Sequence, residues 1–121
     1  MRRRSPRTHR PERVAEAIRQ TVAAFLTSDV RDPRIGFVTV TGVEVSADLA
    51  YACVRVSVMG TEDEKGTSLA GLNSAARFLR AQLGREVPLR VTPELRFELD
   101  RGLEHAQRID AVLRELKEDA G

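Results

Sequence analysis

Residues 36–58, GFVTVTGVEVSADLAYACVRVSV, decide the fold of this chain because they combine many β-branched residues with an alternating pattern. Such a pattern predicts two strands, over residues 36–46 and 49–58, joined by a short turn. Gly42 interrupts the first strand and predicts a β-bulge there. In the second strand apolar and polar side chains alternate, so we expect an antiparallel hairpin with one buried face.

Helical periodicity flanks the hairpin on both sides. Apolar residues recur at three- and four-residue steps over residues 11–28, 69–84 and 103–116, which predicts three amphipathic helices. Residues 94–100 alternate again after Pro93 and predict a third strand. The order is therefore α-β-β-α-β-α, and we expect an α+β fold in which a three-stranded sheet carries its helices on one face.

The start of the middle helix can be placed at two positions. Thr61 and Glu64 have the spacing of a capping box, but Gly66 follows so closely that Thr67 or Ser68 is the expected N-cap. The acidic stretch before this cap is then a linker. We expect its carboxylates to be solvated rather than to hold a cation.

Composition indicates one small domain with an aliphatic core, since 121 residues include no Trp, one Tyr and four Phe. The sequence contains no run of about 18 apolar residues, so it predicts no membrane-spanning helix. No apolar segment follows the basic N-terminus as it would in a secretory signal. Cys53 is the only cysteine, which favours a reducing compartment, so we expect a cytoplasmic protein.

Basic residues gather at one end of the chain although its net charge is only +2. Residues 1–34 contain nine Arg and four acidic residues, whereas residues 91–121 contain five basic and eight acidic residues. Residues 1–9 have no apolar residue after Met1, and we expect them to form a flexible basic arm. A basic end is typical of proteins that bind a phosphate backbone, because their cations displace its counterions.

Arginines of the first and middle helices are the candidate phosphate-binding residues. A guanidinium fork matches phosphate oxygens. For any single Arg a solvated surface role is favoured, but for the group together phosphate contact is favoured, with the side chains converging on one side of the fold. The candidates are Arg10, Arg13, Arg19, Arg31, Arg34, Arg77, Arg80 and Arg85. Tyr51 and Arg55, on the expected open face of the sheet, are a further candidate pair for stacking a base.

The sequence contains no recognisable catalytic motif. It has no Walker loop, no Rossmann fingerprint and no Ser nucleophile elbow. Cys53 lies mid-strand without a nearby His, and the two histidines have no partners at metal-ligand spacing. We therefore expect a protein that is not an enzyme and that uses no cofactor or metal.

Several stretches, in this order and spacing, resemble the ribosome-binding factor A family over about residues 8–116. They are residues 10–18 (RPERVAEAI), 32–34 (DPR), 38–41 (VTVT), 48–52 (DLAYA) with Val54 and Val56, 72–80 (LNSAARFLR), 89–97 (LRVTPELRF) and 109–116 (IDAVLREL). The resemblance implies an Ala-x-Gly bend between two helices, where ordinary KH domains have a GxxG loop. The matching positions are Ala75, Ala76 and Arg77, so Arg stands where the family has Gly. Arg lacks glycine's access to positive φ, and it places a cation where the family's bend faces RNA.

The resemblance implies a type II KH-like domain over residues 10–100, followed by a C-terminal helix and tail over residues 101–121. It also implies a function: binding of immature small-subunit (16S) rRNA and help in late maturation, rRNA end processing and growth in the cold, without catalysis. The expected partners are the small ribosomal subunit and its precursor rRNA, bound by a monomer in the cytoplasm.

Two other functions remain possible from the sequence. A DNA-binding regulator would read bases with its first helix, and that helix offers only Gln20 for adenine. A protein-interaction adaptor would dock a partner on the acidic C-terminal helix, and its binding would not respond to salt.

Overall fold

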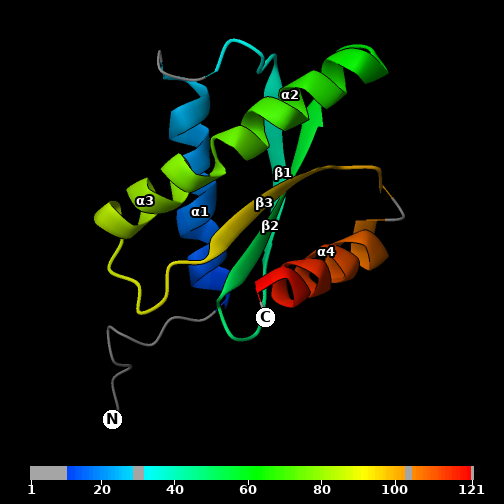
Figure 1. Cartoon of the computed structure of the whole chain (residues 1–121). Helices are drawn as coiled ribbons and strands as arrows, with labels where there is room; N and C mark the ends of the chain where they lie inside the picture. Colours follow the sequence, from blue (N-terminus) through cyan, green and yellow to red (C-terminus); the bar gives the residue numbers. More distant parts are fainter. Residues whose placement is uncertain (1–10, 29–31, 103–104, 121) are drawn as a thin grey trace.

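The computed structural model describes residues 11–28, 32–102 and 105–120, so the basic arm expected over residues 1–9 lies outside the described part. The order of elements confirms the predicted α+β class, with the middle helix divided in two (Figure 1). No helix in the described part is both long enough and apolar enough to cross a membrane. The elements are α1 (Pro11–Leu26), β1 (Val38–Val45), β2 (Tyr51–Val58), α2 (Glu62–Ser74), α3 (Ala76–Glu86), β3 (Glu94–Leu99) and α4 (His105–Ala120).

The three strands lie in the order β1-β2-β3, so β2 is central and β3 is an edge. β1 pairs antiparallel with β2, as the sequence predicted, and the register shifts between Val40 and Gly42. This shift confirms the predicted bulge. β3 pairs parallel with β2. A parallel neighbour requires a crossover, which α2 and α3 supply.

Alternation along β2 places its apolar side chains under α1, α2 and α3. Ala52, Val54 and Val56 are fully buried, as is Phe97 on β3. They share one core with the apolar stripe of α1 and with leucines of α2 and α3. Burying a Val or Phe side chain stabilises a fold by roughly 1.5–3 kcal/mol, so this face contributes most of the packing energy.

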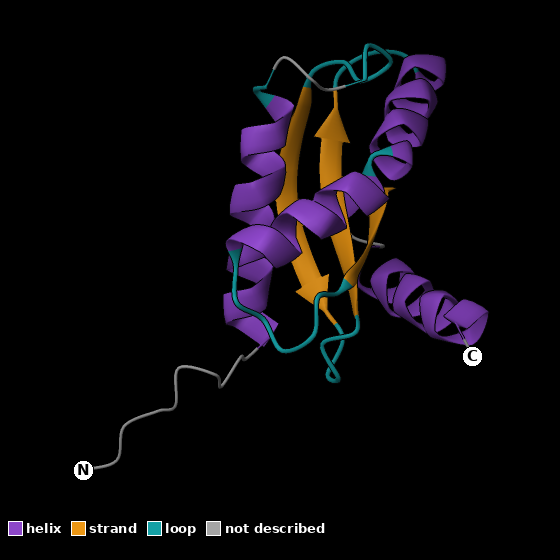
Figure 2. Ribbon diagram, turned by 60° about the vertical axis from the view of Figure 1, so that its left-hand side comes forward, coloured by secondary structure: helices purple, strands orange, loops and turns teal. Residues whose placement is uncertain are grey.

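The C-terminal helix differs from the expected one-sided arrangement. It packs on the opposite face of β2, where Cys53 is fully buried beside Ile109, Val112 and Leu116 (Figures 1 and 2). The expectation that the helices share one face is therefore wrong for α4. The physical reason is a second apolar patch, made by Cys53 and Tyr51, which the apolar stripe of α4 covers.

Helix α2 begins earlier than the sequence predicted. Thr61 is its N-cap and forms a capping box with Glu64: the amide of Glu64 donates to Thr61 Oγ1 (3.1 Å) and the amide of Thr61 donates to Glu64 Oε1 (2.8 Å). The expected cap at Thr67 or Ser68 is wrong, and the supposed linker is helical. A Gly inside a helix costs only about 1 kcal/mol, which the capping bonds and the acidic first turn offset.

A single residue, Ala75, separates α2 from α3. Its φ of −84° and ψ of −4° lie outside the left-handed region, so the change of helix direction in Figure 2 requires no glycine. Arg77 therefore fits where the family pattern has Gly. Helix α3 continues past Gly84, near which the sequence predicted its end, to Glu86.

The bulge in β1 leaves room for a charged side chain of β2. A Cβ atom at Gly42 would overlap the guanidinium of Arg55. Arg55 Nε lies 3.0 Å from Oε1 of Glu44, and its Nη1 lies 3.8 Å from Oδ2 of Asp100. Gly42 thus allows this ion-pair network to cross the sheet.

We expect Gly42→Ala to lower the free energy of unfolding by about 1 kcal/mol, because the guanidinium of Arg55 must shift and its charged hydrogen bonds to Glu44 weaken. Chemical denaturation measures the difference. Gly66→Ala is the matched control, since a Cβ at Gly66 meets nothing within 4 Å, and this helical change should stabilise by roughly 0.5–1 kcal/mol. Equal stability of Gly42→Ala and the parent protein would contradict the assigned role of Gly42.

Candidate nucleic-acid interface

A groove lies between the α2–α3 junction and the edge strand β3. Both helices contact this strand, and Figures 1 and 2 show them next to it. Its volume is about 610 Å³. Residues far apart in the chain meet there because α3 turns at Ala75 and crosses beside β3. The lining residues are Asn73, Ser74, Ala76, Arg77, Arg80, Glu94, Leu95, Arg96 and Glu98.

Asn73 attaches the helix junction to the sheet edge. Its Nδ2 donates to the carbonyl of Phe97 (3.2 Å), and its Oδ1 accepts from the amide of Phe97 (2.9 Å). The carboxamide thus pairs with β3 as a neighbouring strand would. Backbone groups alternate in direction along a strand, so those of Leu95 point to the same outer side, where Leu95 lines the groove.

Three guanidinium groups line the groove. Arg80 donates from Nε and Nη2 to the carbonyl of Thr92 (3.1 and 3.0 Å), which holds it beside the start of β3. Arg77 is exposed, and within the described part of the chain it makes no hydrogen bond or ion pair. Arg96 enters from β3; the sequence prediction missed it, although its place in the charged half of the 94–100 alternation was a usable signal. Guanidinium donors in a groove suit bidentate contact with phosphate.

Arg34 lies beside the same junction but is already paired. Its Nη2 lies 2.7 Å from Oδ2 of Asp32 and donates to Oγ of Ser74 at 3.1 Å. Hydrogen bonds from the side chain and the backbone amide of Arg34 hold the pKa of Asp32 below its usual value. Because Asp32 compensates its charge, Arg34 orders the junction and adds little net positive charge.

In the Arg34→Ala variant we expect the pKa of Asp32 to rise toward its usual value, because the side-chain hydrogen bonds are removed while the backbone amide at position 34 remains. A lowered carboxyl pKa means that the pair stabilises the folded state above the usual pKa of Asp. That contribution disappears as the pH falls through the lowered value. NMR titration of the carboxyl carbons measures the change.

Asp48 is the internal control for this titration. Hydrogen bonds from the hydroxyl of Ser46 and the amide of Ala50 lower its pKa, and Arg34 has no part in them. An unchanged pKa of Asp32, or an equal change at Asp48, would contradict the assignment.

Carboxylates share the groove with the arginines. Glu94 and Glu98 extend from β3 on the same side as Arg96, two residues away in either direction. Such a mixed lining repels a continuous run of phosphates, but it offers acceptors to base amino groups and to 2′-hydroxyls. The groove therefore suits single-stranded RNA, with its bases and sugars accessible, better than duplex DNA.

Arg19 does not reach the groove. It donates from Nη1 to the carbonyl of Val40 on β1 (3.4 Å) and lies 3.9 Å from Glu16. Since β1 and β3 are opposite edges of the sheet, the width of the sheet separates Arg19 from Arg77 and Arg80. The arginines that the sequence led us to expect on one side thus fall into at least two groups, because Arg19 covers the β1 edge.

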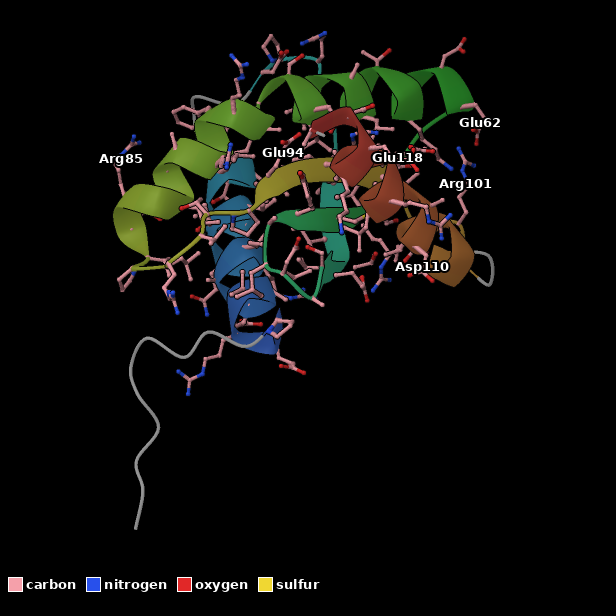
Figure 3. All side chains as sticks on the ribbon, turned by 60° about the horizontal axis from the view of Figure 1, so that its bottom comes forward. Glu62, Arg85, Glu94, Arg101, Asp110 and Glu118 are labelled. Atoms are coloured by element: carbon pink, nitrogen blue, oxygen red, sulfur yellow. The ribbon has the colours of Figure 1, made fainter. Side chains whose placement is uncertain are left out.

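The other candidate arginines lie outside the groove lining. Arg13 is exposed on α1, about 120° around the helix from Arg19 at 100° per residue. Arg85 is exposed in the last turn of α3 and points away from the sheet in Figure 3. Arg10 and Arg31 lie outside the described residues.

An aromatic ring that sequence reasoning missed stands next to Arg77. Phe78 is 48% exposed, and its ring centroid lies 6.0 Å from that of Phe25. It lines a hollow that shares Ser74 with the groove. Stacking of bases on aromatic rings is common in single-strand binding, so Phe78 is placed to supply it.

The candidate stacking pair, Tyr51 and Arg55, does not lie on an open sheet face. Tyr51 packs in the small apolar cluster under α4, and Arg55 is held by Glu44 and Asp100. The candidate pair depended on the expectation that all helices share the other face, and α4 covers this one.

These features define a class of protein: a small KH-like α+β domain with an arginine-lined groove suited to single-stranded RNA. Among the described residues, no group of three or more His, Cys, Asp or Glu is placed to hold a metal ion. The family model of ribosome-binding factor A matches residues 10–113. The chain therefore belongs to the ribosome-binding factor A family.

Individual relatives support this assignment. Ribosome-binding factor A of Desulforamulus reducens is 49% identical over 109 residues, 90% of this chain and 91% of its own. That of Trichlorobacter lovleyi is 50% identical over 107 residues, 88% and 87% of the two chains.

Solved structures of relatives share the fold. The solution structure of a ribosome-binding factor A homologue from Thermotoga maritima matches with a TM-score of 0.60 and 34% identity, over 78% of this chain and 86% of that chain. The Thermus thermophilus factor, fitted as a homology model into a cryo-EM map of its 30S complex, matches with a TM-score of 0.56 and 29% identity, over 77% and 93% of the two chains.

Proposed function

We propose that this protein is a non-catalytic ribosome-binding factor that binds the rRNA of the small ribosomal subunit through the groove between the α2–α3 junction and β3. The observation that carries the proposal is the placement of Arg77, Arg80 and Arg96 around the outer edge of a strand. Membership of the family supports the choice of partner, since the Thermus thermophilus relative was fitted into a map of a 30S complex.

In this proposal Arg77, Arg80 and Arg96 contact phosphates, which positions the RNA without reading its sequence. Phe78 stacks a base at the helix bend. The carboxylates of β3 accept hydrogen bonds from base amino groups and 2′-hydroxyls, and the backbone of Leu95 donates and accepts at base and sugar edges. Specificity then comes from the shape of a single-stranded segment. Further salt-sensitive contacts come from Arg10, Arg13, Arg19, Arg31 and Arg85, whereas Arg34 is paired with Asp32 and orders the helix junction.

The proposed biological role is late maturation of the small subunit. The protein, a cytoplasmic monomer, holds one conformation of the immature 16S rRNA while other enzymes process its ends, including during growth in the cold. Contacts made by a few guanidinium groups are reversible and weaken with salt. Such contacts suit a factor that must leave the finished subunit.

Sedimentation of the purified protein with small subunits through sucrose gradients tests this function. We expect co-sedimentation at roughly 50 mM salt and extensive release at roughly 200 mM, because counterions then compete with the arginines for phosphate. No association at low salt would overturn the proposal. Association that ignores salt would instead favour an adaptor held by apolar contacts.

A further inference from the structure

The hairpin carries two exposed apolar side chains where its open end meets α2. Phe37 is 77% exposed and Met59 is 73% exposed. They are direct neighbours, because the amide of Met59 donates to the carbonyl of Phe37 (3.1 Å). Aromatic residues and Met are enriched where protein surfaces dock, so this pair forms a candidate contact surface.

The backbone that presents these side chains is firmly held on both sides. The hydroxyl of Ser68, which is only 3% exposed, accepts from the amide of Gly36 (3.0 Å) and donates to the carbonyl of Arg34 (3.4 Å). The capping box at the start of α2 holds the chain that follows Met59. Phe37 and Met59 are therefore exposed on a preorganised backbone, which reduces the entropy cost when a partner binds.

The hollow next to Met59 is acidic. Asp63 and Glu64 line it together with one cation, Arg34, whose charge Asp32 already compensates. The adjacent Glu62 is paired with Lys65 and Arg101, both at 3.7 Å, and Figure 3 shows Glu62 and Arg101 side by side. The partial positive charge of about +0.5 at a helix N-terminus does not cancel two carboxylates. The surface therefore attracts cations and repels phosphates.

We propose that Phe37, Met59, Asp63 and Glu64 form a docking patch for a basic protein segment of the small subunit. An apolar side chain of that segment covers Phe37 and Met59, and a Lys or Arg pairs with Asp63. Bound RNA is disfavoured here by the same carboxylates. The inference rests on the proposed function, because the subunit supplies the segment, and it gives the molecule separate contact surfaces for RNA and for protein.

Photocrosslinking of the full chain on purified small subunits tests the docking patch. A diazirine-bearing phenylalanine replaces Phe37 in one sample and Phe78, beside the groove, in another. We expect adducts with a subunit protein from position 37 and adducts with rRNA from position 78. The docking patch would be overturned by an adduct from position 37 with rRNA or with a second copy of the chain. The absence of any adduct from position 37 would overturn it as well. If only position 37 fails, the proposed function stands; if position 78 also gives no rRNA adduct, both fail.

A binding measurement separates the two surfaces a second way. The double variant Phe37→Ser, Met59→Ser should weaken subunit binding by about 10- to 100-fold without changing the salt dependence, because no cation is removed. Val91→Ser, at another exposed apolar position (43% exposed), is the matched control and should bind normally. Equal affinities of the double variant and the control would also overturn the docking patch.

Discussion

Replacing Arg77, Arg80 and Arg96 together with Ala is expected to lower the affinity for small subunits by about 100-fold or more. A hydrogen bond to a charged group contributes roughly 1.5–3 kcal/mol, and about 1.4 kcal/mol is tenfold in affinity. The slope of log affinity against log salt should also fall by about one unit for each arginine–phosphate pair that the substitutions remove. A fluorescence anisotropy titration with labelled protein over a salt series measures both quantities.

A variant with the same charge change elsewhere is the control for this result. Arg101, Arg114 and Lys117 are exposed and lie on or before α4, and replacing all three with Ala removes the same charge. We expect this variant to retain most of the affinity. A decrease as large as that of the groove variant would mean that net charge alone governs binding, and it would contradict a localised site.

Leu79→Ala is expected to lower the free energy of unfolding by about 2–5 kcal/mol. The Leu79 side chain is fully buried, and it belongs to the core that joins α3 to α1 and the sheet. The free energy of unfolding of a small domain is roughly 5–15 kcal/mol, so this one change removes a large part of the stability. Denaturant unfolding followed by circular dichroism measures it.

Leu113→Ala gives the same chemical change in the small cluster under α4. Leu113 is only partly buried there, so the expected decrease in the free energy of unfolding is about 1 kcal/mol. Equal decreases for the two variants would contradict the division into a main core under α1, α2 and α3 and a smaller one under α4.

The hairpin was the most predictable part of the fold. Its period of two and its β-branched residues are local signals, and Gly42 marked the bulge within them. The amphipathic stripe of α1 was similarly clear, and the structure buries Val14, Ile18 and Val22 as expected. These features follow from the chain's own periodicity, which does not depend on distant contacts.

The features that the sequence did not predict depend on contacts between distant elements. The stripe of α4 shows that this helix packs on something, but not that Cys53 and Tyr51 provide a second apolar face for it. To place the start of α2, the stabilisation by a capping box must be compared with the cost of a Gly inside the helix. Both free energies are small, and the prediction gave more weight to the Gly than to the capping box that the structure contains. The bend at Ala75 was expected from the family resemblance alone, because its backbone conformation is open to any residue and leaves no local signal of its own.

The candidate site was partly predictable for the same reason. Arg77 and Arg80 are three residues apart on the same face of the helix, away from the buried leucines, so their exposure followed from helix geometry. Their meeting with Arg96 required the parallel pairing of β3 and the hydrogen bonds of Asn73 to its edge. The contact of Arg19 with the β1 edge is equally a product of the folded arrangement.

Directed hydroxyl-radical probing tests most directly whether the groove faces rRNA. Cys53 is fully buried, so an iron chelate can be attached selectively to a cysteine introduced as Ser74→Cys in the groove or as Glu118→Cys on α4 (Figure 3). With the protein bound to small subunits, we predict strong and localised cleavage of 16S rRNA from position 74 and little from position 118. Stronger cleavage from position 118, or none from position 74, would contradict the groove as the RNA-binding surface.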